Sequence, residues 1–292
     1  MKLGIITPVL TLTPGGHARW ERDGTIDDVV RIGQAADRLG YDHLTCSEHV
    51  VVPLDAVATR GGRYWDPLAT FGYLAAHTSR IRLMTNVLVL GYHHPLAIAK
   101  RYGTLDRISG GRLVLGVGVG SLKEEFELLG AAFEDRGPRG DDSLRALRAA
   151  LSQEAPSYDG EYYRFSGMVV DPCALQTPVP LWIGGRTARS LRRAVELADG
   201  WCPFSVTPEQ ATTWLTKAAA TEAWAAREQP LDVVLQTQRP VDPSAAPDEA
   251  ATAARQLREA GATMLSLRLI HHSLEHYIEQ LGAMAEVVAA LD

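Results

Sequence analysis

The chain has 292 residues, of which 46% are hydrophobic and 22% charged, and its formal net charge at pH 7 is -6. Such a composition is typical of a globular protein with enough apolar material for one large core. The acidic balance argues against nucleic acid or an anionic membrane as the main partner, although it is compatible with a local basic pocket for a small anion.

The first ten residues contain a single lysine and a short apolar stretch interrupted by Pro8. This pattern favours a first strand over a signal peptide. No apolar run reaches the length of a transmembrane helix, so we expect a cytoplasmic protein. Three cysteines without any C-x-x-C pair predict neither a disulfide framework nor a zinc ribbon.

Short apolar runs alternate with longer amphipathic segments along the whole chain, and each such pair predicts one strand followed by one helix. In chain order, the predicted strands cover 3–8, 41–47, 81–90, 112–118, 180–185, 200–204, 231–238 and 263–270. The helices that follow them cover 25–40, 66–79, 95–109, 122–151, 187–200, 207–227, 248–260 and 273–291. In the fourth pair the helical layer is interrupted by a Gly/Pro turn between 130 and 141.

Three local signals sharpen this assignment. Asp66 is a plausible N-cap with Pro67 in the first helical turn. Thr207 and Gln210 have the spacing of a capping box, in which each side chain satisfies a free amide of the other residue. Residues 158–180 are too polar and too rich in proline for a helix, so we expect an excursion with a small β-hairpin.

Eight strand–helix pairs in 292 residues correspond to about 36 residues per pair, which suits a closed (β/α)8 barrel. An open doubly wound sheet is the alternative, but the uninterrupted count of eight favours the barrel, as one domain over 1–292. In a barrel the functional residues follow the strands. The positions that this rule selects are Thr7, 47–49, 86–87, 116–121, 184–187, His271 and His272.

The turn after the fourth predicted strand is rich in glycine but does not carry a dinucleotide fingerprint. In a G-x-G-x-x-G pattern that begins at Gly116 or Gly118, the third glycine falls on Ser121 or Lys123. The glycines could instead serve packing, because small residues let neighbouring elements approach. The ligand of this turn therefore has to be decided by the rest of the chain.

The turn after the fifth predicted strand, "IGGRT", is the sharper phosphate candidate. Gly184 and Gly185 allow close approach of the backbone to a ligand, Arg186 adds a guanidinium, and Thr187 begins a helix whose free amides face a bound anion. The alternative is that the two glycines only permit a tight turn and that Arg186 is solvated.

Glu48 and His49 stand side by side at the end of the second predicted strand. A histidine titrates near neutrality and can exchange a proton with a reacting group, which suits an acid or base that accompanies hydride transfer. A histidine at a strand end is also often only a hydrogen-bonding fixture. No metal site is expected, because the two pairs of adjacent histidines, 93–94 and 271–272, lack the spacing of metal ligands. The sequence contains no G-x-S-x-G motif, so it does not indicate a hydrolase.

Across nearly its whole length the chain resembles the luciferase-like monooxygenase class of flavin and deazaflavin enzymes, specifically its F420-dependent oxidoreductase branch. The resemblance is densest in "SEHVVVP", in residues 64–130 and in "PVPLWIGGRTARSLRRAVELADGW". It implies a (β/α)8 barrel with a deazaflavin or flavin ring at the mouth formed by the carboxyl ends of the strands.

Residue roles follow from the same resemblance. It implies a non-prolyl cis peptide at Asn86 and Val87 under the ring, with the backbone of Gly116, Val117 and Gly118 beside the ring. It also implies a phosphate tail at Gly184, Gly185, Arg186 and Thr187. His49 matches the histidine beside the reactive face.

Ser121, which we expect among the cofactor-binding residues, departs from this pattern, because some relatives carry a glutamate, which acts as general acid, just after these glycines. Glu48 or a substrate-bound water is then the substitute proton donor.

Three functions remain open at this stage. The first is F420-dependent hydride transfer to or from a small organic substrate. The second is an FMN-dependent monooxygenase that uses a partner reductase and O2. The third is a non-catalytic barrel that binds a cofactor or metabolite. The resemblance also predicts a homodimer, and a flavin or F420 reductase is a further expected partner.

Overall fold

The structure is a computed structural model that describes residues 1–291. Parallel strands pair into a closed ring in the order β3-β2-β1-β11-β10-β9-β8-β5, and pairing between β3 and β5 completes it. The strands of the ring are β1 (Lys2–Ile5), β2 (His43–Cys46), β3 (Arg82–Thr85), β5 (Leu113–Gly118), β8 (Leu181–Gly185), β9 (Gly200–Pro203), β10 (Asp232–Gln236) and β11 (Met264–Leu267). The predicted (β/α)8 barrel is confirmed.

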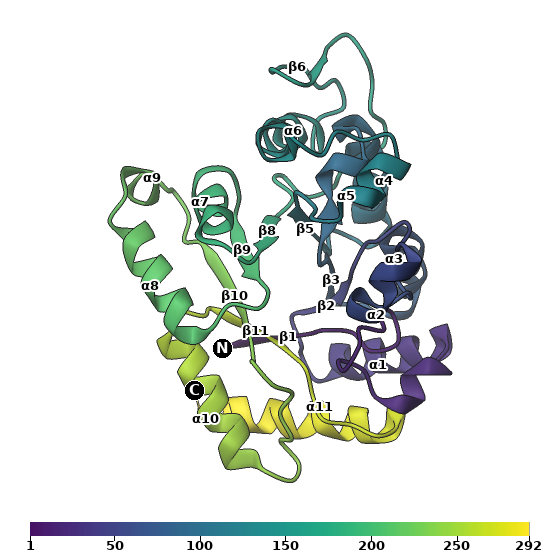
Figure 1. The fold of residues 1–292 in the computed structure, drawn as a ribbon, viewed down its shortest axis with the longest axis vertical. Coiled ribbons are helices and arrows are strands. Elements are labelled where there is room, and N and C mark those ends of the chain that lie inside the picture. Colours follow the sequence, from purple (N-terminus) through teal and green to yellow (C-terminus); the bar gives the residue numbers. More distant parts are fainter. Residues whose placement is uncertain (292) are drawn as a thin grey trace.

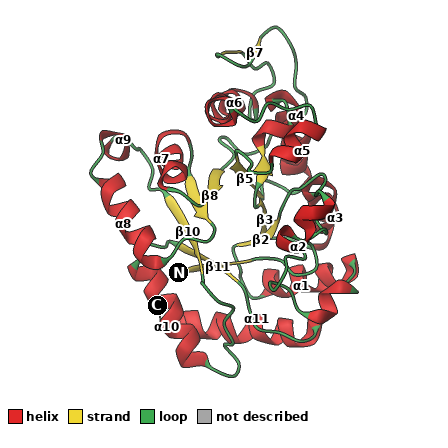
Figure 2. Ribbon diagram, viewed as in Figure 1, coloured by secondary structure: helices red, strands yellow, loops and turns green. Residues whose placement is uncertain are grey.

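Helices surround this ring on the outside (Figure 1). The longer ones are α1 (Ile26–Arg38), α3 (Pro67–His77), α4 (Pro95–Ile108), α6 (Arg136–Ala150), α7 (Ala188–Leu197), α8 (Pro208–Ala219), α10 (Pro247–Glu259) and α11 (Leu274–Ala289). The shorter ones are η1 (Arg19–Arg22), η2 (Leu54–Ala56), α2 (Val57–Arg60), η3 (Leu90–Tyr92), α5 (Lys123–Leu128) and α9 (Glu222–Ala225). Figure 2 shows the same arrangement as an inner set of strands within a ring of helices.

Two helix ends differ by five residues or more from the sequence prediction. The helix expected over 207–227 starts with the predicted capping box but ends at Ala219, because Thr221 caps a second short helix by accepting from the amide of Trp224 at 3.2 Å. The helix expected from 141 starts five residues earlier, at Arg136. Its proline stands in the first turn. Backbone amides in that turn have no acceptor within the helix, so a proline, which has no N–H, costs no hydrogen bond there.

The predicted third strand, 81–90, is interrupted. A cis peptide joins Asn86 to Val87 and separates β3 from β4 (Leu88–Val89). β4 then pairs in parallel with the end of β5. The cis peptide implied at these two residues is therefore present.

The excursion after α6 contains the expected hairpin, in which β6 (Tyr158–Asp159) pairs antiparallel with β7 (Arg164–Phe165). Two buried aspartates attach the excursion to the barrel. Asp142 accepts from the amides of Tyr162 and Tyr163 at 2.8 and 3.0 Å. Asp106 accepts from the amides of residues 175 and 176, each at 2.9 Å. Each carboxylate thus accepts hydrogen bonds from loop amides that have no backbone carbonyl as a partner.

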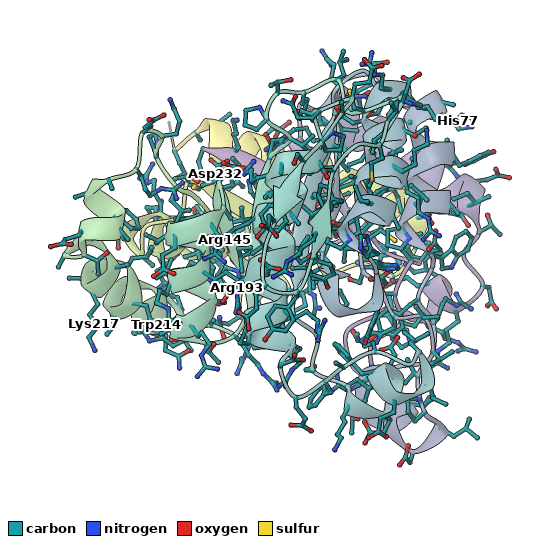
Figure 3. All side chains as sticks on the ribbon, turned by 90° about the horizontal axis from the view of Figure 1, so that it is seen from above. His77, Arg145, Arg193, Trp214, Lys217 and Asp232 are labelled. Atoms are coloured by element: carbon teal, nitrogen blue, oxygen red, sulfur yellow. The ribbon has the colours of Figure 1, made fainter. Side chains whose placement is uncertain are left out.

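Side chains fill the interior of the barrel. An apolar cluster there consists of Met84, Val114, Trp182, Cys202, Val234 and Met264. Below it, at the amino ends of the strands, Asp42 binds Arg82 and lies 3.5 Å from the ammonium of Lys2. Arg82 in turn lies over the indole of Trp182, 5.0 Å from its centroid. Asp232, labelled in Figure 3, starts β10 at the same end. The interior is therefore packed, and it leaves the carboxyl ends of the strands for function.

The helical shell is held by packing and by charge. Arg145 on α6 and Arg193 on α7 are labelled close together in Figure 3, and Arg193 forms an ion pair with Asp141 across these two helices. Trp214 on α8 packs against the buried Trp201 of β9, with 6.2 Å between ring centroids. Among residues 1–291, no helix is both long and apolar enough to cross a membrane.

Candidate active site

The turns after β2, β3, β5 and β8 meet at the carboxyl end of the barrel. The amide of Glu48 donates to the carbonyl of Val87 at 3.3 Å, and the hydroxyl of Ser47 donates to the carbonyl of Asn86 at 2.8 Å. The turn after β2 is therefore tied directly to the cis peptide. Four of the predicted site segments come together here.

Val87 explains two of the glycines. A Cβ at Gly118 would lie 2.8 Å from Cγ2 of Val87, and a Cβ at Gly184 would lie 2.4 Å from its Cγ1. Both distances are shorter than real Cβ contacts, so the two glycines leave room for this side chain. At Gly116 a Cβ would lie 2.0 Å from the carbonyl oxygen of Thr85. Packing needs therefore account for three of the glycines selected from the sequence.

Glu48 is buried and fully engaged. One carboxylate oxygen accepts from the amide of Val89 at 2.7 Å, and the other lies 2.7 Å from Nε2 of His93. Both partners belong to the segment that follows the cis peptide. This geometry favours a role for Glu48 in holding that segment over a role as proton donor.

His49 is oriented by a glutamate that the sequence analysis did not select. Its Nδ1 lies 2.6 Å from Oε2 of Glu125, a residue of α5 with 0% exposure. The hydroxyl of Tyr92 donates to the same oxygen at 2.6 Å, and the amide of Val50 donates to Oε1 at 2.6 Å. Because an ionised carboxylate only accepts, Nδ1 carries the proton. The Nε2 atom of His49 makes no hydrogen bond to the described residues.

Burial raises the pKa of Glu125, but the hydrogen bonds from His49 and Tyr92 and the backbone amide of Val51 outweigh it and hold the pKa below its usual value. Tyr92 responds in the opposite sense, because burial and the neighbouring carboxylate raise the pKa of its hydroxyl. Glu125 is therefore ionised and Tyr92 neutral at pH 7.

A segment from the turn after β2 lies beside His49. The rings of His49 and Tyr64 meet edge to face, with 4.5 Å between centroids. The Tyr64 hydroxyl donates to the carbonyl of Arg60 at 2.6 Å, and the Arg60 guanidinium lies 3.4 Å from Oγ of Ser121. Ser121 thus faces the loop that follows β2.

The turn after β8 presents free donors. Thr187 is the N-cap of α7, but its side chain accepts no capping hydrogen bond. Gly185 has a φ of 140°, a conformation that favours glycine. Arg186 is exposed and forms no ion pair within residues 1–291. Uncapped helix amides beside a guanidinium form an arrangement that suits a phosphate.

The remaining predicted positions have structural partners. Thr7 exchanges hydrogen bonds with Thr45, at 3.0 and 3.3 Å. His271 accepts from the indole of Trp20 at 2.9 Å, and the ring of His272 lies tilted against that of His276, with 4.1 Å between centroids. No group of three or more potential metal ligands occurs in the part of the chain that the structure describes.

Sequence reasoning missed Glu125, Tyr92 and Arg60. The only local signal for Glu125 is an acidic first turn directly after the glycines. Its partner His49 is 76 residues away in the chain, so no spacing rule connects the two.

The family profile of luciferase-like monooxygenases matches residues 1–290. The chain belongs to the luciferase-like monooxygenase family. An F420-dependent glucose-6-phosphate dehydrogenase of Nakamurella multipartita is 32% identical over 183 residues, 61% of this chain and 52% of that protein. An FMNH2-dependent dimethylsulfone monooxygenase of Pseudomonas putida is 27% identical over 180 residues, 60% of this chain and 48% of that protein.

The crystal structure of monooxygenase RslO1 from Streptomyces bottropensis shares the fold. It superposes with a TM-score of 0.79 at 22% identity, over 100% of this chain and 99% of the other. The chain is thus similar both to an F420-dependent enzyme and to an FMNH2-dependent enzyme.

The residues present fit a flavin-type cofactor with an anionic tail. The uncapped start of α7 and the unpaired Arg186 could hold a phosphate, and Nε2 of His49 remains available beside the cis peptide segment to which Glu48 is bound. The fit does not discriminate between a flavin and a deazaflavin.

Proposed function

We propose that the protein is an F420-dependent oxidoreductase that moves a hydride to or from a small organic substrate. The observation that carries the proposal is the pairing of His49 with the buried Glu125, which leaves Nε2 of His49 without a hydrogen-bond partner among residues 1–291. When bound, the cofactor supplies or accepts the hydride. The chain supplies the proton relay and the orientation.

His49 is the acid or base of this proposal. Its Nε2 accepts or returns the proton that accompanies hydride movement at the substrate, while Glu125 keeps the proton on Nδ1 and orients the ring. Tyr92 and the amide of Val50 keep Glu125 in place. Glu48, bound by Val89 and His93, holds the cis peptide segment that forms the wall of the site.

An FMN-dependent monooxygenase that works with a reductase and O2 is the second candidate. The FMNH2-dependent relative and the monooxygenase RslO1 favour it. Sugar-phosphate dehydrogenation is not inferred from the F420-dependent relative, because Ser121 replaces the acid that the resemblance would place there. A barrel that binds a cofactor without turnover is a third reading, and it predicts tight binding with no reaction.

The test is a titration of the purified protein with F420 and, separately, with FMN, followed by absorbance and tryptophan emission. Micromolar binding of F420, with anaerobic oxidation of reduced F420 by an organic acceptor, supports the proposal. Binding of FMN alone overturns it in favour of the monooxygenase. The same preparation, measured by light scattering, tests the proposed homodimer.

A further inference from the structure

Arg60 is the last residue of α2, in the loop that carries His49 and Tyr64. Its backbone is fixed by the Tyr64 hydroxyl, which donates to the Arg60 carbonyl at 2.6 Å. Its guanidinium reaches across to the turn after β5, where it lies 3.4 Å from Oγ of Ser121. The side chain therefore spans two walls of the candidate site.

No carboxylate in residues 1–291 lies within ion-pair distance of this guanidinium. Glu125 acts on the same two tyrosines as Arg60, but His49, Tyr92 and two backbone amides already occupy its oxygens. The contact with Ser121 is long and neutral, so it holds the cation only weakly. A guanidinium has five N–H donors, and the described residues take one of them.

The charge of Arg60 acts on the aromatic groups around His49. Burial raises the pKa of Tyr64 and of Tyr92, and the positive charge of Arg60 opposes the rise at both hydroxyls. Tyr64 contacts the ring of His49 and Tyr92 binds Glu125, so the charge of Arg60 acts on two groups that touch the His49 pair. An anion bound between Arg60 and Ser121 would lie at the same end of the barrel as His49.

We propose that Arg60, with the hydroxyl of Ser121, binds an anionic group of the substrate, so that the oxidoreductase acts on small organic carboxylates or phosphates. This inference rests on the proposed function. When an anion binds, the Arg60 guanidinium gives up its long hydrogen bond to the neutral Ser121 hydroxyl and forms two shorter hydrogen bonds to a charged group. This exchange favours binding. The site is distinct from the phosphate donors at Arg186, which follow β8 on another wall of the barrel.

The test uses cofactor-loaded protein labelled with 15N-arginine, at constant ionic strength. The Nε–Hε signal of Arg60 is assigned by its loss in Arg60→Gln, and the protein is titrated with sodium acetate, inorganic phosphate and neutral acetamide. We expect saturable shifts with acetate or phosphate, which also shows which anion is preferred, and none with acetamide. Arg60→Gln should weaken anion binding at least tenfold, and Arg60→Lys should retain part of it.

Arg101→Gln is the matched control, because Arg101 is an exposed residue of α4; it should bind anions like the unaltered protein. Equal binding by Arg60→Gln, or equal shifts with acetamide, overturns the inference. A loss of cofactor affinity in Arg60→Gln also overturns it, because Arg60 would then bind an anionic group of the cofactor and not of the substrate. Failure of F420 to bind refutes the proposed function instead, and the anion titration can still be measured on the unloaded protein.

Discussion

Nδ1 of His49 and Oε2 of Glu125 are 2.6 Å apart, and the carboxylate has no exposed surface. The pairing fixes which ring nitrogen carries the proton, because an ionised carboxylate can only accept. One buried acid on α5 thus fixes the orientation and the tautomer of a histidine that follows β2.

Replacement of Glu125 by glutamine should lower turnover by about 10²-fold, the lower end of what a positioned acid or base contributes. The amide can donate to Nδ1 and so favour the other tautomer. Cofactor affinity should stay within about tenfold, and the acidic limb of the pH profile of kcat should move. Glu124→Gln, an exposed neighbour on α5, is the control. An unchanged kcat and pH profile would mean that Glu125 only supports the fold.

Removal of the imidazole in His49→Ala should reduce turnover by about 10²-fold or more. Cofactor affinity should again remain within about tenfold, since the side chain is expected to act on the substrate. Steady-state kinetics and the cofactor titration measure the two effects separately. His77→Ala, on the exposed end of α3 (Figure 3), is the matched control. Full activity of His49→Ala would show that His49 has a structural role and is not the acid or base of the reaction.

Arg186→Ala should weaken cofactor binding by about 1.5 to 3 kcal/mol, the contribution of a hydrogen bond to a charged group. The reason is that Arg186 has no carboxylate partner in the described residues and stands before the uncapped start of α7. Fluorescence titration gives the two dissociation constants. Arg192→Ala, which removes an exposed guanidinium from the same helix, should have little effect. Equal losses in both variants would indicate a general charge effect.

Gly116→Ala should destabilise the fold by about 1 to 3 kcal/mol or more, as expected for overpacking a filled site. The new Cβ would lie 2.0 Å from the carbonyl oxygen of Thr85, which is backbone and cannot rotate away. Gly72→Ala on α3 is the comparison, because its Cβ meets nothing within 4 Å. That change should be neutral or stabilising by about 0.5 to 1 kcal/mol. Urea unfolding of both variants checks the difference in sign.

Stability should fall as the pH drops from about 6.5 towards 4 because of His271. Burial, followed by the charges of His276 and His272, lowers its pKa to about 4. Nδ1 accepts from Trp20 only in the neutral ring, although the carboxylate of Glu21, 3.5 Å from Nε2, partly favours protonation. The unfolded chain therefore takes up a proton in this range before the folded chain does. The group stabilises the fold by at most about 3 kcal/mol above pH 6.5.

Urea unfolding at pH 5.0, 6.0 and 7.5 tests this prediction. His271→Gln keeps an acceptor for Trp20 but removes the titration, so its free energy of unfolding should rise less with pH. Parallel curves for the two proteins would show that the histidine does not set the dependence.

The sequence predicted those features that depend on neighbouring residues. Asp66 caps α3 by accepting from the amide of Ala69, and the pairing of Thr207 with Gln210 starts α8, because both signals span only three residues. The break in the third strand is not visible in this way. Asn86 and Val87 lie within residues 81–90, a segment that is typical of one uninterrupted strand, and only the family resemblance indicated the cis peptide.

The site was less accessible to sequence reasoning than the fold. His49 was selected because it follows a strand, but its orientation depends on Glu125, which is joined to it only through a tertiary contact. Glu48 was selected for the same reason as His49. Its partners, Val89 and His93, show that two adjacent residues at one strand end can have different roles.

Trp182 and the apolar cluster around it fill the barrel along its axis, and Arg82 and Asp42 fill its end at the amino ends of the strands. The barrel interior is therefore not a passage for ligands, and a ligand approaches the strand ends from the side of the loops that follow them. One of these loops holds His49, Arg60 and Tyr64. A change in this loop would alter the rates at which ligands enter and leave the site.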